Sequence, residues 1–314
     1  MQDGTIIVVH IDDLLRTFLS KEAETAEVQA ILAYLTIEER GQPTRFLGMD
    51  WKWVAGQLHV SGRMAIEELA RDYQITKSAS SPFTTKFQPE TPVDTKNFQT
   101  LTGRLLFITR MWRPDIRYAV QRLCVKTKTP TQQDWAKGLR IVAYLLRAAS
   151  EGIVLGPEAH QPVNIFTDAG EEKLEERATS GILTRIGRSP VSWAARMQDV
   201  TTLSSTEAEY IALSMGVQDG MWVGKVLEFL NVRDVGVPRI WTDNKGAATL
   251  TKNPNFYRRT MHIRRRHHFI RECAGEGRVV VGWVPGSETL ADALTKVVAG
   301  PRLNELKMAL GMKE

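Results

Sequence analysis

The chain has 314 residues, of which 43% are hydrophobic and 25% are charged, a composition typical of a globular protein with room for two cores. No apolar run approaches the roughly 18–20 residues that cross a membrane. Residues 1–20 lack the order of a signal peptide, so we expect an intracellular protein, cytoplasmic or nuclear. Cys124 and Cys273 form no CxxC motif, which argues against structural zinc and a disulfide framework.

The net charge of +5 is unevenly distributed along the chain. Residues 252–271 contain seven Lys or Arg residues and no acid. Such a run is either a solvated helix face or a nucleic-acid contact. Aromatic residues within it, Phe256, Tyr257 and Phe269, favour nucleic-acid contact because bases pack on aromatic rings.

The first part of the chain reads as mixed strands and helices. Thr5–Leu15 predicts a β-hairpin with Asp12 and Asp13 at its turn. A helical pattern over 21–39, a strand over Arg45–Val54, a strand over Leu58–Val60 and a helix over Met64–Tyr73 follow. Residues 78–94 are rich in Ser, Thr and Pro and predict a linker or a long surface loop.

A compact helical unit is then predicted over residues 95–150. Its helices are expected at Thr95–Trp112, Asp115–Thr127 and Gln132–Ala149. Beyond it, short apolar runs predict the five strands Val163–Thr167, Gly181–Ile186, Val191–Ala195, Arg239–Thr242 and Arg278–Val284. A long helix from Ser204 separates the third strand from the fourth. This order predicts a mixed five-stranded sheet covered by helices.

Four acids are placed to meet at one edge of that sheet. Asp168 and Asp243 follow strands, and Glu209 and Asp292 lie in early turns of helices. Carboxylates without a matching cation in a shared pocket repel one another, and a divalent metal relieves the repulsion. Oxygen-only ligands select Mg²⁺ or Mn²⁺, and two such ions can hydrolyse a phosphodiester.

Glu207 competes with Glu209 for this role. Both lie at a similar angle from the apolar stripe of their helix, so periodicity does not decide between them. Ser204 and Glu207 have the spacing of a capping box, which gives Glu207 a structural task. We therefore favour Glu209 and keep Glu207 as the second choice.

The motifs around these acids resemble, in order and spacing, the ribonuclease H domain of copia-type LTR retrotransposon Pol polyproteins. They are Thr167–Ala169, Ser204–Tyr210, Thr242–Asn244 and Leu290–Asp292. Upstream motifs continue the resemblance to the end of the reverse transcriptase: His10–Asp13, Phe46–Gly48, Leu101–Gly103, Arg113–Ile116 and Trp135. Together they cover essentially the whole chain.

The resemblance implies three segments. Residues 1–77 would be the truncated end of the reverse-transcriptase palm, residues 78–150 a thumb- or connection-like helical segment, and residues 160–314 a ribonuclease H-like α/β domain. Asp12 and Asp13 resemble the polymerase metal motif, with His10 in place of the usual Tyr. The third polymerase aspartate has no counterpart here, so we expect no template copying by this chain alone.

The implied activity is metal-dependent endonucleolytic hydrolysis of the RNA strand of RNA/DNA hybrids. Asp168, Glu209, Asp243 and Asp292 would hold two Mg²⁺ ions, for which Mn²⁺ can substitute. Hybrid contacts to 2′-hydroxyls are expected from Ser205, Thr206 and Asn244. Contacts to phosphates are expected from five arginines, Arg258, Arg259, Arg264, Arg265 and Arg266. Gly170-Glu171-Glu172 departs from the family's usual run and affects the expected substrate fit.

Two alternatives stay open. The chain could be a nucleic-acid-binding remnant of a decayed element without catalysis, or half of a split RNA-directed DNA polymerase completed by an upstream half. As a retroelement protein it would be expected in a retroelement particle. Salt-dependent hybrid binding without Mg²⁺-dependent cleavage would select the first alternative. Primer extension only after mixing with an upstream fragment would select the second.

Overall fold

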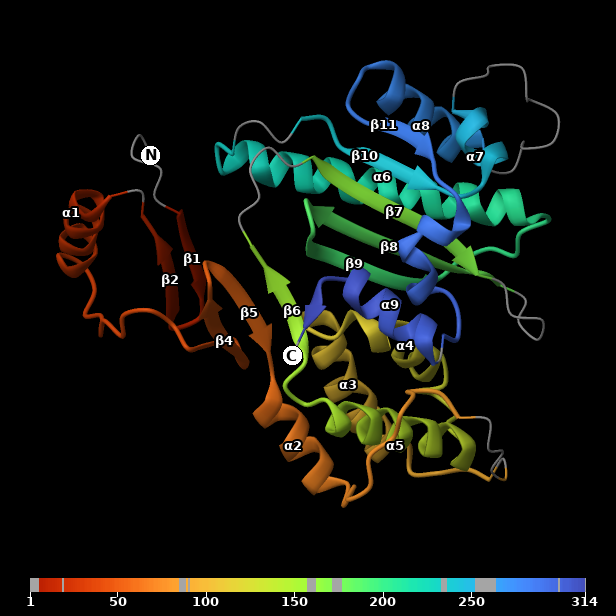
Figure 1. Ribbon diagram of the computed structural model, residues 1–314, viewed down its shortest axis with the longest axis horizontal. Helices are drawn as coiled ribbons and strands as arrows, with labels where there is room; N and C mark the ends of the chain where they lie inside the picture. Colours follow the sequence, from red (N-terminus) through yellow and green to blue (C-terminus); the bar gives the residue numbers. More distant parts are fainter. Residues whose placement is uncertain are drawn as a thin grey trace.

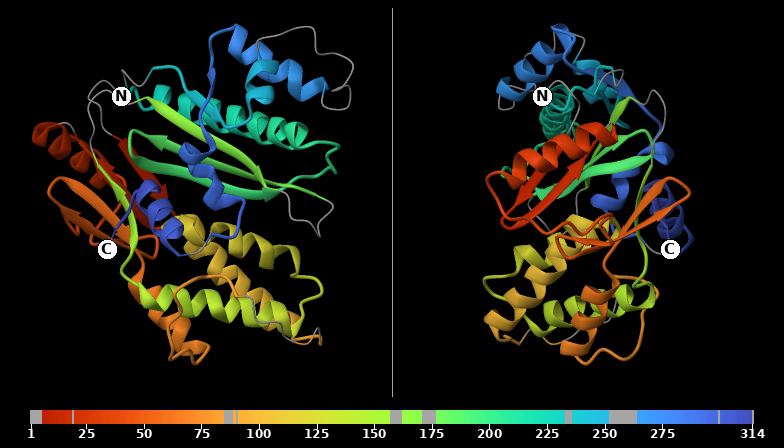
Figure 2. Two further views of the ribbon diagram at one scale, coloured as in Figure 1. Left: turned by 45° about the vertical axis from the view of Figure 1, so that its right-hand side comes forward. Right: turned by 90° about the vertical axis from the view of Figure 1, so that its left-hand side faces the viewer.

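The computed structural model describes residues 6–18, 20–84, 89, 91–156, 162–170, 177–232, 236–251, 264–298 and 300–313. Within these ranges, two five-stranded sheets and one two-stranded hairpin organise the chain (Figure 1). The hairpin consists of β1 (Ile6–His10) and β2 (Asp13–Thr17), antiparallel as predicted. With α1 (Lys21–Leu32) it lies at one end of the molecule, as two further views confirm (Figure 2).

The first five-stranded sheet is antiparallel throughout. Its strands are β3 (Arg45–Phe46), β4 (Met49–Val54), β5 (Gln57–Ser61), β6 (Gly152–Leu155) and β12 (Met312–Lys313), in the order β12-β6-β5-β4-β3. The single strand predicted over residues 45–54 is wrong, because Leu47 and Gly48 adopt positive φ angles of 49° and 76° and turn the chain back on itself. The predicted elements include neither β6 nor β12.

The helical unit begins with α2 (Arg63–Asp72) and continues with α3 (Thr95–Met111), α4 (Arg117–Val125) and α5 (Gln132–Arg147). The helix predicted from Asp115 is divided, since Pro114–Ile116 forms a 3₁₀ turn before α4 starts. Asp115 accepts two hydrogen bonds from the buried guanidinium of Arg113, at 2.9 and 2.8 Å. This pair fixes the corner between α3 and α4.

The second five-stranded sheet is mixed, as predicted. Its strands are β7 (Val163–Gly170), β8 (Thr179–Ile186), β9 (Ser189–Met197), β10 (Arg239–Thr242) and β11 (Val280–Trp283), in the order β11-β10-β7-β8-β9. β10 runs parallel to β7 and β11, whereas β8 is antiparallel to β7 and β9. Two parallel strand ends therefore lie side by side at its centre.

One face of the mixed sheet is covered by α6 (Ser205–Phe229), with α7 (Lys245–Leu250) and α8 (Arg264–Gly275) near its β10–β11 side. Val217 of α6 and Ile165 and Ile240 of the strands belong to one hydrophobic core. α6 packs closely on β7, because a Cβ on Gly216 would lie 2.4 Å from the Thr167 methyl group. This contact sets the height of the helix above the sheet.

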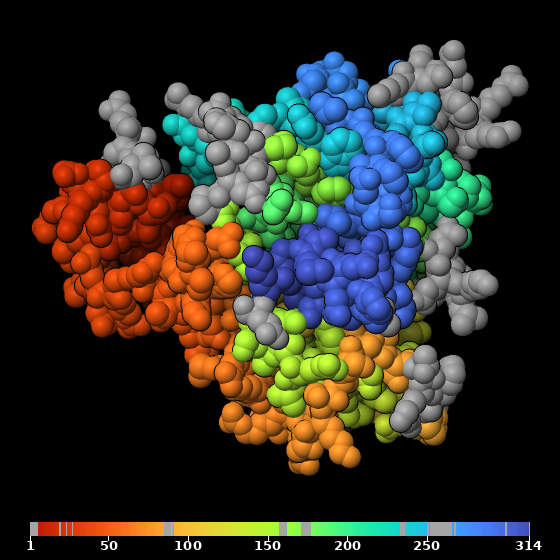
Figure 3. Space-filling view, viewed as in Figure 1, coloured from red at the N-terminus to blue at the C-terminus, as the bar shows by residue number. Residues whose placement is uncertain are grey.

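The other face of the mixed sheet packs on the helical unit. Leu183 and Ala195 of the sheet share a second core with Leu105 of α3 and Leu306 of α9 (Pro301–Ala309). The space-filling view shows the C-terminal residues lying across this junction (Figure 3). The larger core thus joins residues from all three predicted segments.

Candidate active site

Two of the predicted acids lie at the carboxyl-terminal ends of neighbouring parallel strands. Thr242 of β10 lies beside Thr167 of β7 in the strand register, so the next residues, Asp243 and Asp168, are adjacent. Asp168 lies within β7, which extends to Gly170, rather than after its end. The parallel pairing therefore places both side chains at one edge of the sheet, as the sequence predicts.

Glu209 reaches the same place from the start of α6. Its Oε1 accepts a hydrogen bond from the backbone N–H of Ala169, at 3.2 Å. Glu207 lies in the same turn but works as a cap: its backbone N–H donates to Ser204 Oγ at 3.2 Å, and its Oε2 accepts from Leu203 N–H at 2.8 Å. Capping thus uses Glu207 and leaves Glu209 facing the aspartates.

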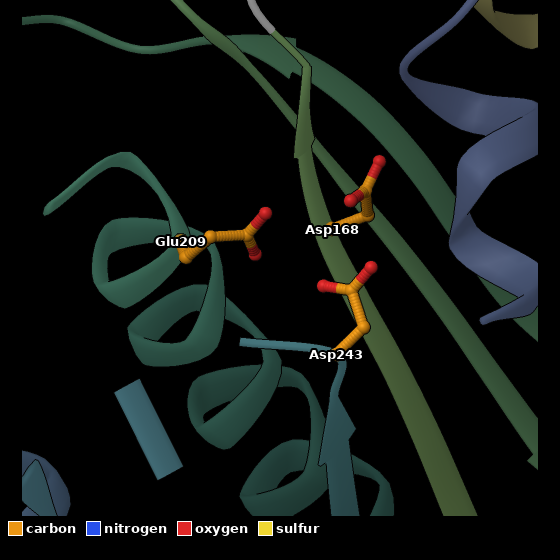
Figure 4. Close-up of side chains that lie close together, drawn as sticks. All are labelled: Asp168, Glu209 and Asp243. Atoms are coloured by element: carbon orange, nitrogen blue, oxygen red, sulfur yellow. The ribbon is translucent and has the colours of Figure 1, made fainter. Parts of the chain in front are cut away.

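Asp168, Glu209 and Asp243 form a compact group of carboxylates (Figure 4). One oxygen from each lies within 4.8 Å of the others. Asp292, on the 3₁₀ turn Leu290–Leu294, stands outside this group and accepts a hydrogen bond from Lys296 Nζ at 2.7 Å. Lys296 Nζ also lies 3.6 Å from Asp168 Oδ2. The structure therefore brings three of the four predicted acids together and links the fourth through a lysine.

The acids are held under electrostatic strain. Burial, and next the charges of Asp168 and Asp243, raise the pKa of Glu209 to about 9. Burial also raises the pKa of Asp168 and of Asp243, although Lys296 partly offsets both shifts. Burial alone would lower the pKa of Lys296, but the neighbouring carboxylates raise it above its usual range. The site therefore has more negative charge than one ammonium group neutralises.

A hard divalent cation fits this donor set. Glu209 Oε2 is buried and has no hydrogen-bond partner among the residues that the structure describes. An unsatisfied buried carboxylate oxygen costs free energy that a metal bond would recover. All donors in the group are carboxylate oxygens, which suit Mg²⁺ or Mn²⁺ and not zinc held by thiolates.

Lys296 and Thr295 contribute to the site although no role is predicted for them from the sequence. The hydroxyl of Thr295 donates to Asp168 Oδ2, and the ammonium of Lys296 bridges Asp168 and Asp292. The spacing of Asp292 and Lys296, four residues apart, is the one sequence signal that could have indicated an ion pair.

The predicted nucleic-acid contacts are placed unevenly. Ser205 is exposed and Thr206 is half-buried on the first turn of α6, close in sequence to Glu209. Asn244 Oδ1 caps α7 by accepting from Ala247 N–H at 2.9 Å. Arg266 is half-buried on α8. Arg258 and Arg259 lie outside the described residues, as do the side chains of Arg264 and Arg265.

The polymerase-like aspartates lie in another part of the fold. Asp12 is in the β1–β2 turn, and Asp13 begins β2; both are exposed. The two residues belong to the terminal hairpin and not to the mixed sheet. Among the described residues, they are not part of the group of acids that could share a metal ion.

Three comparisons with known proteins bear on the family. No protein-family model matches the chain. Within the described ranges, none of the helices combines the length and apolarity that crossing a membrane requires. The chain is 30% identical to the retrovirus-related Pol polyprotein from transposon RE1 of Arabidopsis thaliana, over 99% of this chain and 22% of that protein. It is 25% identical to the one from transposon TNT 1-94 of Nicotiana tabacum, over 98% of this chain and 24% of the relative.

The chain thus spans less than a quarter of the length of these curated relatives. Among solved structures, it matches the foamy viral protease-reverse transcriptase in complex with an RNA/DNA hybrid at a TM-score of 0.53 and 15% identity. That match covers 94% of this chain and 37% of the viral chain. The predicted resemblance to copia-type Pol polyproteins and the predicted ribonuclease H-like mixed α/β fold are confirmed.

Proposed function

As a relative of the retrovirus-related Pol polyproteins of copia-type transposons, the chain carries a ribonuclease H-like fold, and we propose that it hydrolyses the RNA strand of RNA/DNA hybrids. The observation that carries this proposal is the group formed by Asp168, Glu209 and Asp243, with a buried Glu209 oxygen that lacks a partner among the described residues. Lys296 offsets only part of the repulsion within this group, and a divalent cation would offset the rest.

Each acid has a defined part in the proposed activity. Asp168, Glu209 and Asp243 would hold Mg²⁺, and Asp292 would join them once Lys296 moves from between Asp292 and Asp168. Bound Mg²⁺ would activate water and stabilise the leaving oxygen of the phosphodiester. The hydrogen bond from Ala169 N–H fixes the Glu209 carboxylate.

Selection of the RNA strand would rest on groups beside these acids. Ser205 and Thr206 start the helix that carries Glu209, and Asn244 follows Asp243 directly. Hydroxyl and amide groups at these positions can exchange hydrogen bonds with 2′-hydroxyls across the shallow minor groove of the hybrid. Groups that can recognise 2′-hydroxyls therefore lie next to the proposed metal ligands, as binding of an RNA strand at this site would require.

An end-labelled RNA/DNA hybrid incubated with Mg²⁺ tests the proposal. We expect wild-type protein to cut the RNA strand and to leave double-stranded DNA intact, and EDTA to stop the reaction. Asp243→Asn should reduce cleavage by more than about 100-fold. Mutating residues that only hydrogen-bond to metal ligands typically lowers activity 10–100-fold, and the loss of a ligand itself should cost more. Asp13→Asn is the matched control, since Asp13 is exposed on the terminal hairpin.

The outcomes separate the alternatives. Equal cleavage by wild type and Asp243→Asn would show that the activity does not come from this site. Hybrid binding by wild type without any Mg²⁺-dependent cleavage would leave a binding remnant as the better description.

A further inference from the structure

The residue that follows β9 is a buried glutamine, Gln198, which is only 3% exposed. Its backbone N–H extends the pairing of β8 with β9 by donating to the Ala178 carbonyl at 2.8 Å. Its side-chain Nε2 donates to two acceptors, Ser180 Oγ on β8 and the Ala208 carbonyl in the first turn of α6, both at 2.9 Å. Gln198 therefore joins the sheet to the start of the helix that carries Glu209.

Stability of the fold does not account for an amide at this position. Glutamine side chains are mostly exposed in proteins. The Oε1 atom of Gln198 is buried and has no hydrogen-bond donor among the residues that the structure describes, and a buried carbonyl oxygen without a donor costs free energy. Methionine would fill the same space without that cost. The use of the amide therefore lies in the two groups that Nε2 holds together.

The strand to which Gln198 is bonded has little freedom to move. Ser180 is fully buried, and successive residues of a strand point to opposite faces of the sheet. A Cβ on the next residue, Gly181, would lie 2.6 Å from the Thr295 methyl group. β8 is thus packed between α6 on one face and the 3₁₀ turn of Asp292 on the other. Its bond to Gln198 ties the first turn of α6 to a fixed part of the sheet.

A closed path of contacts leads from Gln198 to the carboxylates. Ala208, which accepts one of its bonds, directly precedes Glu209. Glu209 Oε1 accepts from the Ala169 N–H at 3.2 Å. Ala169 lies beside Ser180 in the strand register, and Ser180 accepts the second bond from Gln198. The position of Glu209 above the sheet therefore depends on Gln198.

The first turn of α6 needs such a tie because helix ends fray. Glu209 reaches from this part of the helix towards Asp168 and Asp243 (Figure 4). Mg²⁺ requires nearly ideal octahedral geometry, with metal–oxygen distances of about 2.0–2.1 Å. A small displacement of the turn would move one carboxylate out of range of an ion that the other two bind.

We propose that Gln198 is a positioning residue for the divalent ion: by bonding the Ala208 carbonyl to Ser180, it sets the distance of Glu209 from the two aspartates. The inference rests on the proposed function for the use of the ion. Gln198 acts through Glu209, because its own amide is bonded to Ser180 and Ala208. Residues behind metal ligands that fix their orientation contribute to metal affinity in this way.

Mg²⁺ binding to the free protein, measured from the rise in melting temperature with Mg²⁺ concentration, tests this role. Gln198→Met removes both donors and keeps the side-chain length. We expect it to raise the Mg²⁺ dissociation constant about tenfold and to change the melting temperature in EDTA by about 4 °C or less. Ser180→Ala removes one of the two acceptors and should raise the dissociation constant by a smaller factor. It keeps the proposal testable if Gln198→Met does not fold.

The matched control is the same substitution at another buried glutamine. Gln121 on α4 is 7% exposed, and its Oε1 also has no partner among the described residues. Gln121→Met should leave the Mg²⁺ dissociation constant unchanged. An equal loss of Mg²⁺ affinity in Gln121→Met and Gln198→Met would show a general loosening of the fold and overturn the proposal. Unchanged Mg²⁺ affinity in the folded Gln198→Met and Ser180→Ala variants would also overturn it.

A double-mutant cycle tests whether Gln198 acts through Glu209. In a Glu209→Gln background, titrated over higher Mg²⁺ concentrations, the further change Gln198→Met should alter the dissociation constant by less than about twofold. The carboxylate that Gln198 positions is already absent there, so little affinity is left for it to influence. The same tenfold loss in both backgrounds would mean that Gln198 reaches the ion by another route and would overturn its assigned role.

Failure of this proposal differs from failure of the proposed function. A chain that binds Mg²⁺ with an affinity dependent on Gln198 but cuts no hybrid retains the positioning residue and loses the nuclease. A chain that cuts hybrid with the same Mg²⁺ dependence in the wild type and in Gln198→Met retains the nuclease and loses the positioning residue. A wild-type melting temperature that does not respond to Mg²⁺ would overturn both.

Discussion

Glu209→Gln should stabilise the metal-free protein, although it removes a proposed metal ligand. The pKa of Glu209 is raised from 4.5 to about 9, so between these pH values the unfolded chain releases a proton that the folded chain retains. Stability contributed by this group is complete below pH 4.5 and is lost as pH rises towards 9. At pH 7 the loss amounts to about 3 kcal/mol, from 1.36 kcal/mol for each pH unit above 4.5.

Glutamine removes this pH-dependent loss because it carries no charge at any of these pH values. Its side-chain carbonyl can still accept from Ala169 N–H. Its amide group can donate to the carboxylates of Asp168 and Asp243, which lie within 4.8 Å of Glu209. We therefore expect a gain of about 2–3 kcal/mol at pH 7 and almost none near pH 4.5.

Urea unfolding followed by circular dichroism, in EDTA at pH 5, 7 and 8, measures this difference. Glu207→Gln is the matched control in the same helical turn. Its carboxylate caps the start of α6, so its loss should cost about 0.5–1 kcal/mol. Added Mg²⁺ should stabilise the wild type more than Glu209→Gln, because only the wild type has the full set of ligands. A Glu209→Gln variant no more stable than the wild type at pH 7 would refute the reasoning.

Other predictions concern the groups around the site. Lys296→Met should lower metal-free stability by about 1 kcal/mol and decrease the Mg²⁺ concentration that raises the melting temperature, because the ammonium bridging Asp168 and Asp292 competes with the metal; an unchanged Mg²⁺ titration would contradict this. Gly216→Ala should cost about 1–3 kcal/mol in urea unfolding, since its Cβ would lie 2.4 Å from the Thr167 methyl group. Gly275→Ala is the control, because a Cβ there meets open space, and it should cost less. Asp115→Asn should cost about 3–5 kcal/mol in urea unfolding, because it leaves the buried Arg113 guanidinium with only the more distant carboxylate of Glu151, at 3.7 Å.

Local patterns in the sequence predict much of the mixed sheet and its acids. β10 coincides with its predicted range, and the parallel ends of β7 and β10 bring Asp168 and Asp243 together as expected. β6 and β12 could not be found in this way. β12 is only two residues long, too short for a periodic signal, and the pairing of both strands depends on distant parts of the chain.

The carboxylates of the site could be predicted from the sequence, but the position of the lysine beside them could not. Carboxylates at strand and helix ends carry a local signal, and the cap at Ser204 separates Glu207 from Glu209. The position of Lys296 depends on how the 3₁₀ turn packs on β7 and β8, which no local pattern encodes.

The pairing of β12 with β6 has a consequence for the timing of synthesis. Met312 lies beside Ile153, and at 5–20 residues per second roughly 8–30 s pass on the ribosome before this partner of β6 exists. Until then one edge of β6 has exposed backbone groups that can pair with another chain. Lys307, the ion-pair partner of Glu151 beside β6, arrives equally late. We therefore expect nascent chains to be most aggregation-prone just before these residues emerge.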